Sequence, residues 1–159
     1  DLGCGNGYLS LPIAKRIGPE GTVQCVELQP QYFAQIEKRA AEAGVENYEL
    51  VRATATDPRI QDGTCDPVLM VDVYPELALP EPVLRNVAAA LKPDGRLALV
   101  EFRSEDPEVR IKRLHKMTKA QAVLELEANG WTLAESFEGL PWQHLLFFAP
   151  PEAEASEGD

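Results

Sequence analysis

The sequence predicts a single α/β domain built on an open, mostly parallel sheet of seven strands with helices on both faces. Apolar runs of strand composition alternate with segments of helical spacing, which is typical of right-handed βαβ crossovers. The last two strand-like runs are joined by a short connection, which predicts a C-terminal antiparallel hairpin. A strand leading into the glycine turn at the start should supply apolar residues before Asp1, so we expect a truncated first strand.

The first half of the chain shows helical and strand periodicities in turn. Leu9, Ile13 and Ile17 recur every four residues, which predicts a helix that the following glycine ends. Pro30 suits the first position of the next helix. The expected elements, in order, are a helix over 9–17, a strand over 22–27, a helix over 30–43 and a strand over 48–51.

The second half continues the alternation and then departs from it. Lys92-Pro93-Asp94-Gly95 is expected to stop a helix, and Thr118-Lys119-Ala120-Gln121 matches a capping box. Residues 103–117 form a long charged loop of the kind that is often functional. The expected elements are a strand over 68–71, a helix over 83–91, a strand over 96–102, a helix over 118–129 and strands over 131–138 and 143–149.

Composition narrows the class of protein. The 159 residues fit one domain over residues 1–149, followed by an acidic tail over 150–159 that we expect to be disordered. The net charge of −11 gives no electrostatic footprint for nucleic acid. No apolar run is long enough for a membrane span. Small molecules are the more plausible partners, and the sequence leaves the oligomeric state open.

The cysteines suggest neither a disulfide framework nor a metal site. Cys4, Cys25 and Cys65 are odd in number, form no C-x-x-C pair and have no histidine cluster nearby. We therefore predict no bound metal and a cytoplasmic location.

The glycine turn Gly3-Cys4-Gly5-Asn6-Gly7 has the spacing of a ligand-binding turn. Glycine lacks a Cβ, so a ligand can approach the backbone N–H groups closely. A dinucleotide fingerprint would need glycine where Tyr8 stands, and a P-loop would need a Gly-Lys-Ser/Thr ending. A glycine turn without a ligand is the alternative.

Acidic residues follow the predicted strands at the edge where ligands bind in open parallel sheets. Glu27 ends the second strand and can accept hydrogen bonds from both hydroxyls of a ribose, the alternative being a solvated surface residue. Asp72 ends the fourth strand. Glu101 occupies a similar position, with surface solvation as its alternative.

Several stretches together resemble the class I, Rossmann-like methyltransferases that depend on S-adenosylmethionine (SAM). They are Asp1-Leu2-Gly3-Cys4-Gly5-Asn6-Gly7, Val26-Glu27-Leu28, Val68-Leu69-Met70-Val71-Asp72-Val73-Tyr74 and Leu91-Lys92-Pro93-Asp94-Gly95-Arg96-Leu97. The resemblance runs from Asp1 to about Pro150. It implies SAM as the cofactor and the same arrangement of parallel strands with a terminal hairpin.

The resemblance also implies roles for individual residues. The cofactor would meet the turn formed by Asp1, Gly3, Cys4, Gly5, Asn6 and Gly7, with Asp1 helping to hold the methionine amino group. The remaining contacts would be Glu27 to the ribose, Leu28 to the adenine, and Asp72 with Val73 to the methionine portion. Thr54 and Ala55 stand where many family members carry an acidic residue near the adenine amino group, which departs from the family pattern.

Two further segments narrow the resemblance without giving a substrate. Ile111-Lys112-Arg113-Leu114-His115-Lys116-Met117 and Leu140-Pro141-Trp142-Gln143-His144 look like those of a bacterial group of small methyltransferases of unassigned substrate. The chain is more distantly similar to the ubiquinone and menaquinone biosynthesis methyltransferases.

Methyl transfer needs alignment of the nucleophile, exclusion of water and, for some acceptors, removal of a proton. His144 and His115, the two histidines, are predicted near the ligand edge and are candidate general bases. A histidine that hydrogen-bonds a loop is the alternative for each. Tyr74 is the third candidate in the active site and, with Trp142, is expected to wall a substrate pocket. Core packing is the alternative for Trp142, and surface solvation is the alternative for Tyr74.

Two functions of different class follow from these observations. The first is methyl transfer from SAM to a small-molecule acceptor by in-line displacement. The second is a non-catalytic SAM-binding or partner module derived from a methyltransferase. A nicotinamide oxidoreductase is disfavoured by Tyr8.

Overall fold

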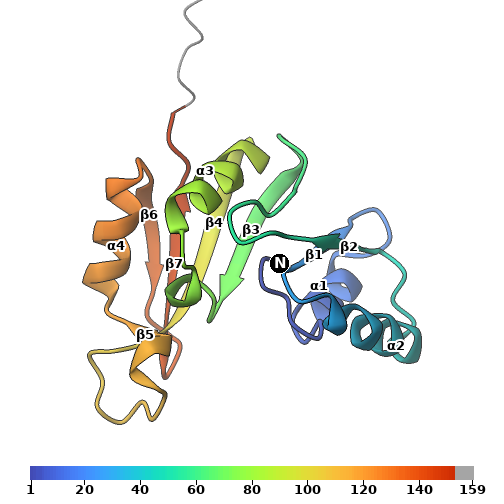
Figure 1. The fold of residues 1–159 in the computed structure, drawn as a ribbon, viewed down its shortest axis with the longest axis horizontal. Coiled ribbons are helices and arrows are strands. Elements are labelled where there is room, and N and C mark those ends of the chain that lie inside the picture. The colour runs from blue at the N-terminus through green and yellow to red at the C-terminus, as the bar shows by residue number, and fades with distance from the viewer. Residues whose placement is uncertain (153–159) are drawn as a thin grey trace, which may run out of the picture.

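The computed structural model describes residues 1–152, and residues 153–159 of the expected acidic tail lie outside this range. Strands and helices alternate as expected (Figure 1). The first half contains α1 (Ser10–Ile17), β1 (Val23–Glu27), η1 (Pro30–Tyr32), α2 (Phe33–Ala43) and β2 (Tyr48–Arg52). The second half contains β3 (Cys65–Val71), η2 (Tyr74–Glu76), α3 (Pro80–Ala90), β4 (Leu91–Arg103), η3 (Arg113–His115), β5 (Lys116–Met117), α4 (Lys119–Ala128), β6 (Thr132–Phe137) and β7 (Gln143–Ala149).

The strands form two sheets, so the prediction of one mostly parallel seven-stranded sheet is wrong. A five-stranded mixed sheet has the order β3-β4-β7-β6 with β5 beside β4, and β1 and β2 form a separate parallel pair. Leu2 makes isolated parallel bridges to Val26 of β1 and to Met70 of β3. Leu2 thus lies between β1 and β3 and pairs with both.

The C-terminal hairpin is confirmed. β7 runs antiparallel to both of its neighbours, pairing Leu146 with Leu99 of β4 and Phe148 with Leu133 of β6. β3 and β5 run parallel to β4. The carboxyl ends of β3 and β4 therefore lie at the same edge as the start of β7.

Helices cover both faces of the strands, as β1 shows. Cys25 packs in a buried cluster with Leu11 of α1 and Ile36 of α2. The next residue, Val26, points to the opposite face and joins a cluster that contains Leu84 of α3. Alternate strand side chains point to opposite faces. The α/β class of the prediction is confirmed.

Two element boundaries illustrate local rules. Thr118 caps α4 by accepting a hydrogen bond from the Gln121 amide at 3.0 Å, as the capping-box pattern predicts. The expected turn at 92–95 is instead part of β4, whose pairing with β3 shifts register between Cys65 and Pro67. Such a bulge absorbs extra residues in one strand.

Candidate functional site

A cavity of about 370 Å³ lies at the carboxyl ends of β1 and β3, beside the glycine turn. We call it the glycine-turn cavity. Its lining residues are Leu2, Gly3, Gly5, Val26, Glu27, Leu28, Gln29, Tyr32, Ala53, Thr54, Ala55, Pro58, Val71, Asp72, Val73, Glu76, Leu77, Ala78 and Val83. In Figure 1 the start of the chain lies between β1 and β3, which is where this edge opens.

The turn brings bare backbone to the cavity wall. Gly3 and Gly5 have φ values of 76° and 52°, in the left-handed region that favours glycine. A Cβ on Gly3 would lie 2.4 Å from Val73 Cγ2, whereas one on Gly5 would meet nothing within 4 Å. Gly3 therefore permits close packing, and Gly5 leaves open space where a ligand can approach.

Glu27 fastens this turn to the end of β1. Its side chain is buried, with only 6% of the residue exposed. Oε2 accepts a hydrogen bond from the Gly5 amide and Oε1 accepts one from the Gln29 amide, both at 2.9 Å. A carboxylate has about four lone-pair positions. Glu27 is thus no solvated surface residue, and each oxygen retains capacity for a further donor.

Asp72 forms the opposite wall of the cavity. Its backbone has a positive φ of 56°, unusual for a residue other than glycine. Its carboxylate oxygens accept hydrogen bonds of 3.1 and 3.2 Å from the Gln143 side chain. Burial raises the pKa of Asp72, the bond from Gln143 opposes this rise, and the negative charge of Glu76 adds to it.

The cavity gathers eight of the twelve residues predicted to contact the cofactor: Gly3, Gly5, Glu27, Leu28, Thr54, Ala55, Asp72 and Val73. The Thr54 hydroxyl accepts the Asp57 amide at 3.0 Å, so it serves the local loop. The roles assigned to these residues stay predictions.

Four predicted cofactor residues do not line the cavity. Asp1 Oδ2 accepts a hydrogen bond from the Ser10 hydroxyl at 2.5 Å. Cys4 is buried in the cluster of α1 and α2, and Gly7 packs between Leu11 and Ile36. Asn6 lies in the turn without reaching the cavity lining. These residues support the shape of the turn.

The three active-site candidates differ in their access to the cavity. His144 is 4% exposed, and its Nε2 lies 3.0 Å from Glu105 Oε2. Tyr74 is buried in the core, where burial and the Glu125 carboxylate raise the pKa of its hydroxyl. Neither lines the cavity. His115 reaches it indirectly, since its Nδ1 lies 2.6 Å from Glu76 Oε1, and Glu76 is a lining residue.

Glu101 is the main residue whose environment sequence reasoning missed. It is 1% exposed, and its Oε1 accepts the amides of Val73 and Tyr74 at 3.1 and 2.9 Å. Burial raises the pKa of Glu101 to about 8 against the lowering effect of these two bonds, and the charges of Asp72 and Glu76 raise it further. Its position near a strand end could be predicted from the sequence, but its burial could not.

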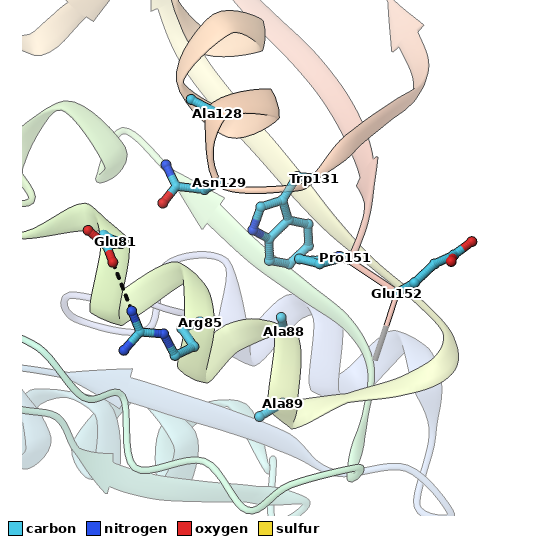
Figure 2. Close-up of a pocket in the computed structure, with 9 residues that line it drawn as sticks. All are labelled: Glu81, Arg85, Ala88, Ala89, Ala128, Asn129, Trp131, Pro151 and Glu152. Carbon is cyan, nitrogen blue, oxygen red and sulfur yellow. Dashed lines mark hydrogen bonds and ion pairs between the residues drawn. The ribbon is translucent and has the colours of Figure 1, made fainter. Parts of the chain in front are cut away.

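A larger hollow of about 780 Å³ lies elsewhere and shares no lining residue with the glycine-turn cavity. Figure 2 shows it between α3, the end of α4 and the chain after β7, with Trp131 and Pro151 on one side. Glu81 and Arg85 of α3 form an ion pair of 2.8 Å across one helical turn. None of the predicted cofactor residues contributes to this hollow.

The cysteines and acidic residues form no metal centre within residues 1–152, where no group of three or more His, Cys, Asp or Glu side chains is placed to hold an ion. Cys4, Cys25 and Cys65 are free thiols. No helix in the described part of the chain combines the length and apolar character needed to cross a membrane.

Relatives of known name match the chain over different lengths. Nocamycin O-methyltransferase from Saccharothrix syringae is 31% identical over 102 residues, which cover 62% of this chain and 35% of that protein. Aklanonic acid methyltransferase DauC from Streptomyces sp. strain C5 is 25% identical over 166 aligned positions, covering 91% of this chain and 74% of that protein. The chain therefore spans about a third of the first relative and about three quarters of the second.

The fold and the family agree with these relatives. A SAM-dependent methyltransferase from Aquifex aeolicus superposes with a TM-score of 0.86 at 20% identity, covering 93% of this chain and 79% of that one. Residues 1–95 match the methyltransferase domain family. This match covers more than half of the 159 residues, including the glycine turn, Glu27 and Asp72. The chain belongs to the class I SAM-dependent methyltransferases.

Proposed function

We propose that this chain binds SAM in the glycine-turn cavity and transfers its methyl group to a small-molecule acceptor by in-line displacement. The observation that carries the proposal is the hydrogen bond between the Gly5 amide and Glu27 Oε2, which sets a ligand-accessible turn beside a buried carboxylate. Asp72 closes the cavity from the other side. The cavity thus presents open space at the Gly5 backbone, a carboxylate that can accept hydrogen bonds from a diol, and negative charge at Asp72.

The lining residues fit the parts of SAM. Glu27 would hold the ribose hydroxyls through its remaining lone pairs, and Leu28, which is 52% exposed, offers an apolar face to the adenine. Asp72 and Glu76 place negative charge along one wall, which favours a ligand with an ammonium and a sulfonium. When bound, SAM supplies the electrophilic methyl group on its sulfonium.

The acceptor side is proposed from chemistry and from the relatives. The two relatives above are named for nocamycin and aklanonic acid, which supports a small organic acceptor. The net charge of −11 disfavours a nucleic-acid acceptor. Three free thiols suit a reducing compartment, so we place the protein in the cytoplasm.

His115 is the better placed of the two histidines to take a proton from an acceptor. Its partner Glu76 lines the cavity, and a carboxylate that contacts an imidazole orients the ring for general-base catalysis. His144 lies on β7 opposite Glu101 of β4, is buried, and does not line the cavity. Tyr74 contributes to packing under η2.

A non-catalytic SAM-binding module is the second candidate. The observation that favours it is the exclusion of His144 and Tyr74 from the cavity lining. Such a module would bind SAM through the same glycine turn, at the same carboxyl ends of the strands. It would show no turnover with any acceptor.

Calorimetric titration with SAM tests the binding step. We expect saturable binding that Glu27→Ala weakens at least tenfold, with Glu49→Ala on the exposed face of β2 as the matched control. Thermal unfolding of both variants separates lost contacts from lost fold. Absence of SAM binding by the unaltered chain would overturn both candidates.

Release of S-adenosylhomocysteine in a screen of phenols, quinols, amines and thiols separates the two candidates. Turnover with one of these classes supports the methyltransferase. Binding of SAM without turnover across the whole screen supports the non-catalytic module.

A further inference from the structure

Glu101 and His144 form a buried polar pair between two antiparallel strands. They are register partners on β4 and β7, and are 1% and 4% exposed. Directly opposite residues in an antiparallel pair point to the same face, with Cβ atoms about 4.5–5.5 Å apart. Their side chains therefore share one enclosed space next to the loop that follows β3.

In each of the two side chains, one polar atom has a hydrogen-bond partner and the other has none among the described residues. Glu101 Oε1 accepts the amides of Val73 and Tyr74, and His144 Nε2 contacts Glu105 Oε2. Glu101 Oε2 and His144 Nδ1 are buried, and neither hydrogen-bonds any described residue, so the two atoms do not hydrogen-bond each other. A protonated Oε2 is a donor and an unprotonated Nδ1 is an acceptor, so the two atoms are chemically complementary.

Glu105 connects His144 to solvent. Its side chain is 45% exposed and accepts both the Lys119 amide at 2.7 Å and the His144 contact. These bonds outweigh its partial burial and hold the pKa of Glu105 below its usual range. His144 and Glu105 are thus in contact, and Glu101 lies beside His144 as its register partner without a hydrogen bond between their side chains.

The inner end of the line touches the wall of the glycine-turn cavity. Val73 lines the cavity and donates its amide to Glu101. Glu101 therefore bonds the backbone of a residue in the cavity wall, and a charge bound in the cavity acts on its carboxyl through this wall, where burial strengthens the interaction. Asp72 and Glu76 face the same wall and add negative charge.

We propose that Glu101 is a proton-linked positioning residue, which releases its proton when cationic SAM is bound and regains it beside the neutral thioether product. The inference rests on the proposed function, because it needs SAM in this cavity. Oε2 of Glu101 gives its proton to the solvent, and the carboxylate that remains keeps the amide bonds from Val73 and Tyr74. Proton uptake after methyl loss reverses this transfer.

The charged groups around Glu101 make this exchange responsive to the cofactor. Burial and the carboxylates of Asp72 and Glu76 favour the neutral acid, whereas the two amide bonds and a nearby sulfonium favour the carboxylate. Of the other facing groups, His144 is the register partner of Glu101 and Gln143 is neutral. SAM and S-adenosylhomocysteine differ by one positive charge at the sulfur, so they should set different protonation states.

The test is calorimetric titration of the whole chain with SAM and with S-adenosylhomocysteine near pH 7.5, in buffers of different ionisation enthalpy. The dependence of binding heat on the buffer gives the number of protons released. We expect roughly 0.3 to 0.8 more protons released with SAM than with the product. Equal proton release for the two ligands in the unaltered protein would overturn the inference while leaving the proposed function intact.

Glu101→Gln assigns the proton to this residue. The amide oxygen can still accept the Val73 and Tyr74 amides, and the amide nitrogen can donate toward His144. We expect the SAM-specific proton release to disappear while SAM affinity stays within about fivefold. Glu108→Gln, at an exposed position beyond β4, should keep the release. Persistence of the release in Glu101→Gln would assign the proton elsewhere, and failure to bind SAM at all would overturn the proposed function as well.

Discussion

Gly3 and Val73 pack so closely that a methyl group on Gly3 would lie 2.4 Å from Val73 Cγ2. Both residues line the glycine-turn cavity, one in the turn and one after β3. The contact packs the turn against the loop that follows β3. The backbone at Gly3 also has a φ of 76°, so side-chain space and backbone conformation both require glycine.

Gly3→Ala should destabilise the fold substantially. The branched Val73 side chain must move, and alanine is strained at positive φ, so we expect a loss of about 2–4 kcal/mol in the free energy of unfolding. Urea unfolding followed by circular dichroism measures it. A loss below about 1 kcal/mol would show that the loop after β3 yields freely.

Gly5→Ala is the matched variant, for which we expect a smaller loss of stability than for Gly3→Ala and a loss of SAM affinity. Its Cβ would meet nothing within 4 Å, so only the backbone strain of about 1–2 kcal/mol remains. The methyl group would instead enter the space next to Glu27 where a ligand approaches. We expect SAM affinity to fall at least tenfold with the fold intact, and unchanged affinity would place the ligand away from Gly5.

Glu101 should make stability depend on pH with a definite sign. Its pKa is raised from 4.5 to about 8 in the folded state, so the folded chain binds more protons than the unfolded chain across that window. Stability linked to Glu101 is complete below about pH 4.5 and is lost as the pH rises through about 8. The loss is roughly 3–5 kcal/mol by linkage.

Urea unfolding between pH 5 and pH 9 measures this dependence. Glu101→Gln stays neutral throughout, so its stability should decline less over the same range. Glu108→Gln should retain the slope of the unaltered protein. A slope in Glu101→Gln equal to that of the unaltered protein would contradict the assignment.

His115→Ala and His144→Ala should differ in their effects on turnover and on stability. The His115 and Glu76 side chains are 41% and 56% exposed, so His115→Ala should cost less than about 1 kcal/mol in stability. If His115 removes a proton from the acceptor, turnover should fall by about 10²–10⁴ with SAM affinity within threefold. Lys92→Ala removes a comparably exposed ion pair with Asp66 and serves as the control.

His144→Ala should affect stability first. It removes a buried ring and its contact to Glu105, for which we expect a loss of about 1–3 kcal/mol. Turnover measured below the unfolding range should fall less than for His115→Ala. A larger catalytic loss in His144→Ala than in His115→Ala would reverse the two roles.

Local sequence rules predicted most elements because each rule acts within a few residues. The apolar runs located β1, β3 and β7, and the short connection at 138–142 predicted the hairpin. The capping pattern at Thr118 predicted the start of α4. The division into a two-stranded and a five-stranded sheet depends on pairing between segments far apart in the chain, which local patterns do not report.

Side-chain direction at the strand ends was harder to predict. Glu27, Asp72 and Glu101 all follow apolar runs, yet two of them line the cavity and Glu101 points away from it. The difference arises from tertiary packing, because the loop after β3 turns its amides toward β4. Tyr74 is drawn into the core by the same turn. Sequence periodicity reflects only neighbours along the chain, so it could not predict this long-range contact.

The pairings of Leu2 place the cavity between two strands from different parts of the chain. Leu2 pairs with Val26 of β1 and with Met70 of β3, and the cavity lies at the carboxyl ends of these two strands. A ligand held by Glu27 on one side and by Asp72 on the other would act as a cross-brace. Amide hydrogens on both sides of the cavity should then exchange more slowly, and in concert, once the ligand is bound.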